Sequence, residues 1–527
     1  MQRDMPDAES LEPAARRSKP GAESLEPKAS SGLSYFVALA VALALVVFRA
    51  FVWVWYPHAD FDSDQGIVGL MAKHLAEGRA FPLFFYGQSY LLGVEAWLAA
   101  PVFALAGATP FALKATLLGL NLLLAWLLLR ELVGTAGLRP WAALACSVFV
   151  VLPGPVTAAF LVRAVGMNIE PFIAVLLLWI TRRRPIWFGL ILGIGFLNRE
   201  FTISGLSAVV AVEVLDRSLF TRAALAARGV SLLVFAAVWD LVRVLAPYSS
   251  SHGPGTPPGM LAGAAGSLVA VSTFASFSAP RLWTDVRQLT ERHLPVLLNA
   301  RSLEVSSAAG PVPGVQGADW LWPVLLVALG VPLAVALWRL AREPRRLSSG
   351  SAAFPLYLIL VGAQAALVYA AARGAAMGIY TQRYMLLALL LPVGVSALVM
   401  GQVPGRKLRG VACAGLLLWT AITLADTARL AQAFVRTPPP DSRQELTRAL
   451  VSRGVHYGTA DYWDAYAVTF WAGERVRLTS GISRIAEYDR LVSAHGDEAV
   501  SLKRRACEGC QEVARWWWIT GKGTPWR

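Results

Sequence analysis

The chain from Tyr35 to Trp55 reads YFVALAVALALVVFRAFVWVW, and shortly afterwards it reads His58-Ala59-Asp60-Phe61-Asp62-Ser63-Asp64-Gln65. The first stretch is long enough to cross the ~30 Å hydrocarbon core of a bilayer as a helix, and it is too long to be the apolar part of a signal peptide. The second stretch is acidic and begins where the chain leaves that helix. Together they predict a membrane-spanning helix that leads directly into a polar loop at the membrane surface.

The composition of the whole chain agrees with this prediction. Of 527 residues, 56% are hydrophobic and 16% are charged, and the mean hydropathy is +0.52. Soluble proteins carry about 25% charged and about 45–50% apolar residues, so an ordinary soluble enzyme, a disordered protein and a coiled coil are excluded. Long apolar runs, in place of short alternating segments, exclude a membrane β-barrel. We therefore predict an all-α polytopic membrane bundle.

Apolar segments long enough to form membrane helices recur about eleven times. Several in the middle of the chain are short, so we expect them to be buried within the bundle. The predicted spans are 35–55, 110–130, 141–153, 168–181, 186–198, 201–216, 229–246, 319–338, 353–372, 384–401 and 410–428.

The distribution of positive charge predicts the orientation of these spans. With the N-terminus inside, inner segments hold about twenty Lys and Arg in roughly 80 residues, and outer loops hold about ten in roughly 155. Counting the apolar stretch 89–106 as a further span would abolish this bias, so we predict surface helices within a first outer loop at 56–109. We therefore predict three parts of the chain. Residues 1–33 form a disordered cytoplasmic tail, residues 34–430 form a transmembrane domain with a large outer loop at 247–318, and the C-terminal domain lies on the outer side of the membrane.

Residues 431–527 are much more polar than the bundle. We predict helices at 441–452 and 484–495, and strands near 455–459, 475–479 and 513–519, which make a small α/β domain on the outer face. Cys507 and Cys510 cannot complete a zinc site by themselves, and in an oxidising compartment we expect them to form a local disulfide.

Polar residues that are unusual for a membrane protein gather in the predicted outer loops, where ionisable groups are commonly functional or paired. Each has a simpler interpretation too. The aspartates 60, 62 and 64 suit a helix start, Glu95 and Glu170 suit pairing with Arg163 or Arg199, and Arg383 suits the membrane interface. We interpret His74 as a packed or solvated helix residue, not as a ligand. The candidate functional residues are Asp62, Asp64, Gln65, Gln88, Tyr90, Glu95, Arg163, Glu170, Arg199, Arg383 and Tyr384.

This arrangement resembles the GT-C superfamily of glycosyltransferases that use lipid-linked sugars, near the bacterial relatives of protein O-mannosyltransferases and lipid A aminoarabinose transferases. The resemblance covers about 35–430 in topology, and in motif it is confined to about 58–100, 163–170 and 380–384. A softer likeness to the outer domain of some bacterial members covers 460–466 and 470–476.

The resemblance implies a site and a reaction. The family's catalytic Asp in the first outer loop falls on Asp64, while Gln65 stands where the family has Glu. A further acid in the second outer loop falls nearest Glu170, and an Arg-Tyr pair near the end of a late span matches Arg383-Tyr384. The implied donor is a polyprenyl-phosphate sugar, whose phosphate needs cations such as Arg383, Arg199 and Arg163. Asp64 is then the base for the acceptor, and in-line attack inverts the anomeric centre.

No residue pattern demands a cofactor, although Asp62 and Asp64 would be available to a divalent metal ion. The expected partners are the lipid bilayer, the donor and an unidentified protein, lipid or glycan acceptor, with no nucleic acid. Two other functions stay open. A transporter or lipid-linked-sugar flippase would place its polar residues near the membrane midplane in two related halves. A catalytically degenerate scaffold would be consistent with Gln65.

Overall fold

The computed structural model describes most of the chain, namely residues 30–88, 90–250, 279–303, 305–307, 310–312, 317–343, 350–373, 377–515 and 517–521. The predicted disordered tail up to residue 29, most of the Gly- and Pro-rich part of the loop 247–318, and Trp516 lie outside these residues.

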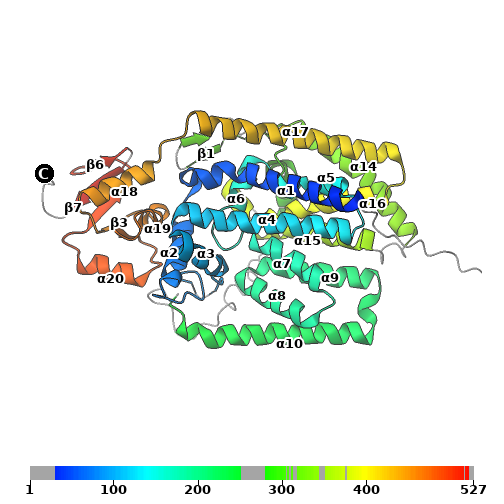
Figure 1. Cartoon of the computed structure of the whole chain (residues 1–527), viewed down its shortest axis with the longest axis horizontal. Helices are drawn as coiled ribbons and strands as arrows, with labels where there is room; N and C mark the ends of the chain where they lie inside the picture. Colours follow the sequence, from blue (N-terminus) through cyan, green and yellow to red (C-terminus); the bar gives the residue numbers. More distant parts are fainter. Residues whose placement is uncertain are drawn as a thin grey trace, which may run out of the picture.

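The fold is an all-α membrane bundle with a small α/β domain at one end, as predicted (Figure 1). A helix occupies each of the eleven predicted spans. Their bounds are α1 (Ser30–Trp55), α4 (Pro110–Gly134), α5 (Pro140–Val151), α7 (Glu170–Thr181), α8 (Pro185–Asn198), α9 (Ile203–Leu215), α10 (Arg222–Leu245), α14 (Leu321–Arg342), α15 (Gly350–Arg373), η8 with α16 (Ile379–Leu389 and Leu390–Gln402) and α17 (Arg406–Arg436).

Not all of these helices have the length of a membrane crossing. Among the described residues, seven helices are long and apolar enough to cross a membrane, and α5 with α6 (Pro155–Leu161) forms one further pair bent by 82°. The helices α7, α8 and α9 have 12, 14 and 13 residues, so each reaches only about 20 Å. The bend between α5 and α6 follows from Pro153-Gly154-Pro155, because proline cannot continue the hydrogen-bond ladder.

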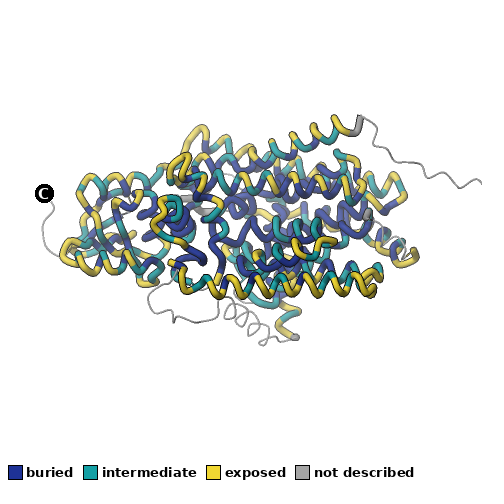
Figure 2. The backbone as a smooth tube through the Cα atoms, turned by 60° about the horizontal axis from the view of Figure 1, so that its bottom comes forward, coloured by how far each residue is buried: buried dark blue, intermediate teal, exposed yellow. Residues whose placement is uncertain are grey.

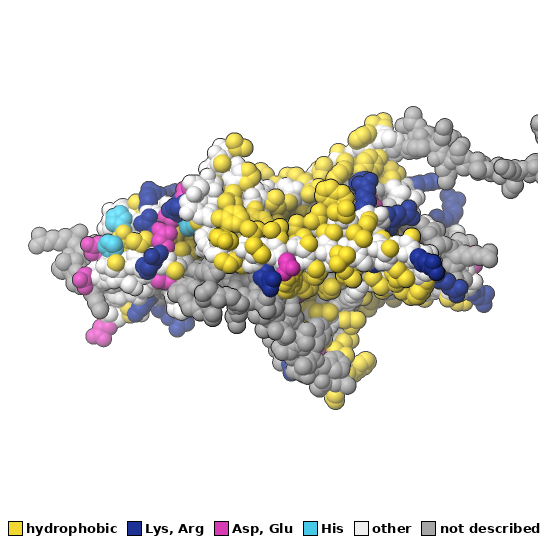
Figure 3. All heavy atoms as spheres, turned by 90° about the horizontal axis from the view of Figure 1, so that it is seen from below, with side chains coloured by type: hydrophobic (Ala, Val, Ile, Leu, Met, Phe, Trp, Pro, Cys, Tyr) yellow, Lys and Arg dark blue, Asp and Glu magenta, His cyan; other side chains and the backbone are white. Residues whose placement is uncertain are grey.

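Small residues let the bundle helices approach closely, which is the usual way membrane helices associate. Ala38, Ala42 and Ala50 of α1 are fully buried, and α1 packs against α4 and α5. A Cβ at Gly189 of α8 would lie 2.5 Å from the carbonyl oxygen of Ser231 in α10, so only glycine permits this contact. The buried interior of the bundle stands out in Figure 2, and hydrophobic side chains cover much of the bundle surface in Figure 3.

The predicted first outer loop forms the junction between the bundle and the C-terminal domain. It contains η1 (Pro57–Asp60), α2 (Ser63–Ala76) and α3 (Val94–Ala106). The 13 residues of α3 reach about 20 Å, a length close to those of α7, α8 and α9, so its position at the membrane surface stays a prediction. From the second large loop, the described residues include α12 (Ala279–Gln288), a π-helical turn η5 (Leu289–His293), α13 (Leu294–Leu297) and a short hairpin of β1 (Val305–Ser307) and β2 (Gly310–Val312). Three 3-10 turns follow the bundle helices: η2 (Glu200–Thr202), η3 (Ser218–Phe220) and η4 (Ala246–Tyr248).

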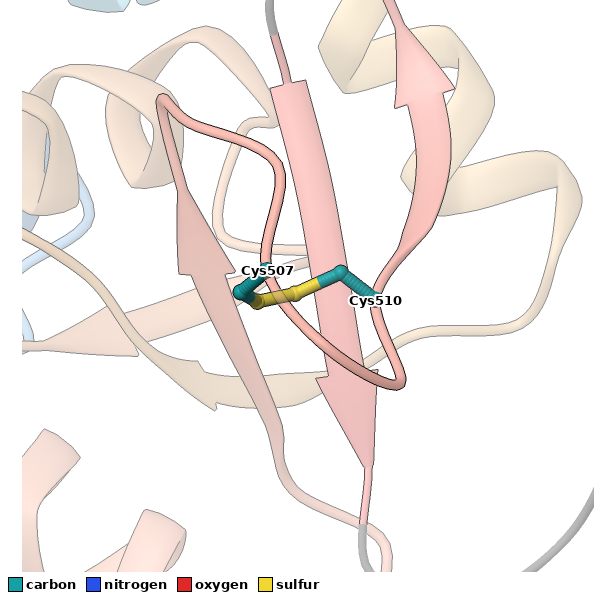
Figure 4. The surroundings of a disulfide bond; sticks show 2 residues. All are labelled: Cys507 and Cys510. Carbon is teal, nitrogen blue, oxygen red and sulfur yellow. A yellow bond between two sulfur atoms is a disulfide. The ribbon is translucent and has the colours of Figure 1, made fainter.

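The C-terminal domain is built on a five-stranded mixed sheet of order β4-β3-β5-β7-β6, parallel across β4, β3 and β5 and antiparallel beyond. Its helices and strands are α18 (Ser442–Ser452), β3 (Tyr457–Thr459), α19 (Tyr462–Trp471), β4 (Arg477–Thr479), α20 (Ala486–Ala494), β5 (Val500–Lys503), β6 (Gln511–Ala514) and β7 (Trp517–Gly521). The single strand predicted near 513–519 is two strands, and sequence reasoning missed α19 and β5. The expected disulfide joins Cys507 and Cys510 in the turn between β5 and β6 (Figure 4).

Candidate active site

Asp64 lies at the start of α2, on the face of the bundle that meets the C-terminal domain. Asp62 caps the helix by accepting a hydrogen bond of 3.1 Å from the backbone N–H of Gln65. Acidic side chains are favourable in a first helical turn, which explains why this acidic loop begins a helix. The same geometry turns the Asp64 carboxylate toward two residues that are distant in sequence.

One hydrogen bond and one ion pair hold the Asp64 carboxylate. The hydroxyl of Tyr462 donates a hydrogen bond of 2.6 Å to Oδ1, and Nη1 of Arg383 lies 3.7 Å from Oδ2. The side chains of Asp64 and Arg383 are each 17% exposed, so the pair is accessible to a ligand without being fully solvated. Arg383 and Asp64 therefore meet as predicted, while Tyr462 is an addition from the C-terminal domain.

The electrostatic environment favours a proton-accepting carboxylate. Burial and the neighbouring negative charge of Asp62 raise the pKa of Asp64. The hydrogen bond from Tyr462 and the charges of Arg383 and Arg484 act in the opposite direction, without cancelling the rise. An aspartate with a raised pKa is a stronger base than a free one, and such groups recur at catalytic sites.

Aromatic and cationic side chains surround Arg383. Its Nη2 donates to the hydroxyl of Tyr384 over 3.3 Å, and the guanidinium of Arg373 lies 4.0 Å from the centre of the Tyr384 ring. The charge of Arg199 also acts on Tyr384. Among the described residues, the buried Nε atoms of Arg383 and Arg199 have no hydrogen-bond partner. These unused donors give the cluster capacity to bind an anion.

Arg484 is a second contribution from the C-terminal domain. Its guanidinium carbon lies 5.6 Å from the ring centre of Tyr462 and 5.7 Å from that of Phe85, and its charge acts on Asp64. Close packing fixes its position, because a Cβ at Gly87 would lie 2.9 Å from the Cα of Arg484. The weaker resemblance of residues 460–466 to the outer domain of some bacterial family members indicated the segment that contains Tyr462. No pattern in the sequence indicated Arg484.

The packing of α19 on α2 brings these residues together. A Cβ at Gly66 would lie 2.5 Å from the carbonyl oxygen of Tyr466, so the two helices touch through backbone. The hydroxyl of Ser63 accepts from the backbone N–H of Tyr466 over 3.0 Å, and Phe470 stacks on Phe61 with ring centres 5.9 Å apart. The first turns of both helices therefore lie side by side at Asp64.

Arg163 forms ion pairs with carboxylates of the first outer loop. It donates through Nε and Nη2 to Asp60 and lies 3.9 Å from Asp62, and these side chains are at most 20% exposed. Burial raises the pKa of Asp60, but Arg163 and Lys114 more than offset this and hold it below its usual range. Lys114 also donates to the backbone carbonyl of Asp60 over 2.9 Å. This network anchors the acidic loop to the bundle.

The remaining candidates in the first loop are mostly involved in packing. Gln65 is buried, and its amide donates to the carbonyl of Asp60 over 3.1 Å. The side-chain oxygens of Gln65 and Gln88 are buried and have no partner within the described structure, whereas Tyr90 is 38% exposed. His74 is packed between Tyr86 and the C-terminal domain, which is the first of the two environments expected for it.

Glu95 and Glu170 form a separate buried pair. The Glu95 carboxylate accepts from the backbone N–H of Gly166 over 2.7 Å and faces Glu170, with the charge of Arg199 nearby. Two buried carboxyl groups that face each other favour a shared proton. Arg163 does not pair with them, so of the two expected cation partners only Arg199 lies close.

Within the described chain, no group of three or more His, Cys, Asp or Glu is arranged to hold a metal ion. The predicted residues thus divide into three sets. Asp64, Arg383 and Tyr384 meet beside Arg199. Arg163 and Asp62 belong to the loop anchor, and Glu95 and Glu170 form a buried pair on which the charge of Arg199 also acts.

Comparison of the structure with solved proteins identifies the fold. ArnT from Cupriavidus metallidurans, solved with bound undecaprenyl phosphate, aligns with a TM-score of 0.51 at 11% identity, covering 94% of this chain and 99% of that one. The oligosaccharyltransferase AglB from Archaeoglobus fulgidus, solved with an inhibitory peptide and a dolichol-phosphate, aligns with a TM-score of 0.48 at 13% identity, covering 89% and 69%. No protein-family model and no curated protein sequence matches. The similarity to ArnT confirms the predicted GT-C fold in a multi-pass membrane protein.

Proposed function

We propose that the protein is an inverting glycosyltransferase that moves a sugar from a polyprenyl-phosphate donor to an acceptor at the outer face of the membrane. The observation that carries this proposal is the contact of Asp64 with Arg383 and Tyr462, within a fold shared with a protein solved with undecaprenyl phosphate. A base beside an anion-binding arginine is the pair of groups that such a transfer requires.

The donor phosphate would bind to the cluster of Arg383, Arg199 and Tyr384. A guanidinium holds two phosphate oxygens at once and so orients the donor as well as binding it. The unused Nε atoms of both arginines support this role. Arg163 is a poorer candidate than the sequence suggested, because Asp60 and Asp62 already neutralise it.

Asp64 would accept the proton of the acceptor hydroxyl or amine. As that group attacks, its bond to the anomeric carbon forms and the bond from this carbon to the phosphate oxygen breaks, so the electron pair leaves with the polyprenyl phosphate. The leaving phosphate requires charge stabilisation more than a proton, which the arginines supply. The reaction in this form needs no cofactor, and attack opposite the leaving group inverts the anomeric centre.

Tyr462 would act as a positioning residue for Asp64. Its hydrogen bond fixes the carboxylate and stabilises its ionised form. Arg484, which lies against the ring of Tyr462 and against Phe85, adds positive charge on the side of the C-terminal domain. In this proposal the C-terminal domain completes the active site in addition to any contact it makes with the acceptor.

Two alternative functions explain the observations less well. A transporter or flippase would carry its polar residues in the middle of the bundle, whereas Asp64 lies at the junction with the C-terminal domain. A degenerate scaffold has no need for a carboxylate that is held by both a tyrosine and an arginine. The Cys507–Cys510 disulfide supports a C-terminal domain in an oxidising, periplasmic or extracellular compartment. The distribution of Lys and Arg favours a cytoplasmic N-terminus, and we propose the inner membrane as the location of the bundle.

A transfer assay tests the proposal. Purified protein in lipid nanodiscs is given a panel of radiolabelled polyprenyl-phosphate sugars with membrane extract as the source of acceptor. We expect label to leave the lipid with one donor, and Arg383→Ala to weaken the binding of that donor at least tenfold. Label that stays on the lipid with every donor, or donor affinity that is unchanged in Arg383→Ala, would contradict the proposal.

A further inference from the structure

A second basic site lies at the other end of α2, between this helix and the C-terminal domain. It is a cavity of about 360 Å³. Its charged and titratable lining residues are Lys73, Arg79, His456, Glu474, Arg475 and Arg477. Its volume lies within the range of small-molecule binding sites. Lys73 comes nine residues after Asp64 in the same helix, so the cavity is ~14 Å along the helix from the candidate active site.

The acid in this cavity is fully engaged and does not compete with an incoming anion. Glu474 is only 4% exposed, and its carboxylate accepts from Lys73, Arg79, His74 and Tyr488. Although burial opposes ionisation, these donors hold the pKa of Glu474 well below its usual range. Glu474 is thus a permanent anion whose function is to fix Lys73 and Arg79 at the wall of the cavity.

Arg475 and Arg477 are different, because no carboxylate neutralises them among the described residues. Nε of Arg475 donates only to the backbone carbonyl of Ala472, over 3.1 Å. Nε of Arg477 is buried and has no hydrogen-bond partner in the described structure. Four Lys and Arg side chains line the cavity together with Glu474. Glu77, just outside the lining, pairs with Lys73 over 2.7 Å and lies 3.6 Å from Arg79, so the net charge around the cavity is about +2.

We propose that this cavity binds a phosphate group carried by a small ligand or a lipid headgroup, at a site separate from the cluster around Asp64. The observations that carry the proposal are the volume of this open cavity, the excess of positive charge and the two arginines without an ionic partner. Two guanidinium groups in one cavity match the geometry of phosphate oxygens, which each of them can bind through two N–H groups. This proposal does not depend on the transfer reaction.

Calorimetric titration of inorganic pyrophosphate tests the site. The full-length protein is placed in nanodiscs of phosphatidylcholine at low salt, in an Arg383→Ala background that silences the cluster beside Asp64. We expect saturable binding that weakens at least tenfold in the Arg475→Gln/Arg477→Gln double variant. The exposed Arg490 of α20 does not line the cavity, so Arg490→Gln is the matched control and should change the affinity less than twofold.

Two further arms make the result decisive. The charge-preserving Arg475→Lys/Arg477→Lys variant should recover part of the affinity, which separates lost charge from lost folding. In nanodiscs that contain phosphatidylglycerol, weaker pyrophosphate binding assigns the site to a lipid headgroup, and unchanged binding assigns it to a soluble phosphate ester. Absence of saturable binding in phosphatidylcholine, or equal losses in the double variant and in Arg490→Gln, would overturn the proposal.

Discussion

Replacing Tyr462 by phenylalanine isolates the contribution of the C-terminal domain to the candidate active site. The change removes one hydroxyl, which donates the 2.6 Å hydrogen bond to Asp64, and keeps the ring that lies beside Arg484. Burial and Asp62 already raise the pKa of Asp64, and this hydrogen bond is one of the interactions that oppose the rise. In the variant the pKa of Asp64 is therefore raised further.

The size of the effect follows from the type of bond. A hydrogen bond to a charged group contributes about 1.5–3 kcal/mol, and each 1.4 kcal/mol is a factor of ten in an equilibrium. A general base acts only when it is unprotonated, so kcat/KM increases as the pH rises through the pKa of Asp64. We expect Tyr462→Phe to lower kcat/KM by about tenfold or more on the acidic side, and the loss to shrink as the pH increases.

The assay is the pH profile of transfer from the donor that the panel identifies. Tyr457→Phe is the control, because Tyr457 lies on β3 and stacks on His495 away from Asp64. A loss that is equal at every pH would mean that Tyr462 has no influence on the ionisation of Asp64. An unchanged profile would remove the C-terminal domain from the chemistry.

Three further changes test how the site is assembled. Gly66→Ala places a Cβ 2.5 Å from the carbonyl oxygen of Tyr466. The overpacking should cost ~1–3 kcal/mol and lower transfer at least tenfold. Gly119→Ala is the control, because its Cβ meets no atom within 4 Å, and it should change neither activity nor thermal unfolding. Glu474→Gln should destabilise the protein by ~3 kcal/mol in thermal unfolding, because the cationic side chains of Lys73 and Arg79 lose this buried counter-charge. Since the pKa of Glu474 is depressed, this stabilisation is fully present above its ordinary pKa of 4.5 and is lost as the pH falls below that value, so the difference between wild type and variant should shrink in acid. Arg163→Gln should cost ~3–5 kcal/mol of stability and leave donor affinity unchanged. Adding Asp60→Asn should recover part of the lost stability. A fall in donor affinity in Arg163→Gln would show instead that Arg163 binds the donor phosphate.

The membrane bundle could be predicted from the sequence because its main signal, long apolar runs, is local. Each predicted span contains a helix, and the breaks between spans follow residues whose effect is also local, such as Pro153 and Pro155 after α5. The short apolar segments in the middle of the chain also predict short helices, and α7, α8 and α9 have only 12, 14 and 13 residues. What the sequence does not show is which neighbouring helices bury them, because that is a property of the assembled bundle.

The C-terminal domain was harder to predict for a physical reason. The segment Tyr462–Trp471 reads YWDAYAVTFW, which is rich in aromatic and β-branched residues that favour strands, yet it forms α19. Its packing against Gly66 and Gly69 of α2 decides the outcome, and that contact joins positions about 400 residues apart. Tertiary packing of this kind leaves no local pattern.

The candidate active site was predictable in part. Acidic and basic residues at the ends of membrane helices predict a polar site, and Asp64 and Arg383 do meet there. Arg163 suits a phosphate and a carboxylate equally well, so sequence alone does not reveal that Asp60 neutralises it. Tyr462 and Arg484 belong to a separate domain, and only the docking of that domain brings them to Asp64.

The proposed role of Asp64 as the base of a glycosyl transfer can be measured in a single turnover with the Asp64→Asn variant. Protein saturated with labelled donor is mixed with acceptor, and donor binding and label transfer are followed in the same sample. We predict that Asp64→Asn binds donor as wild type does, since Arg383 is intact, and transfers label at least a hundredfold more slowly. Transfer at the wild-type rate by a variant that binds donor normally would contradict it.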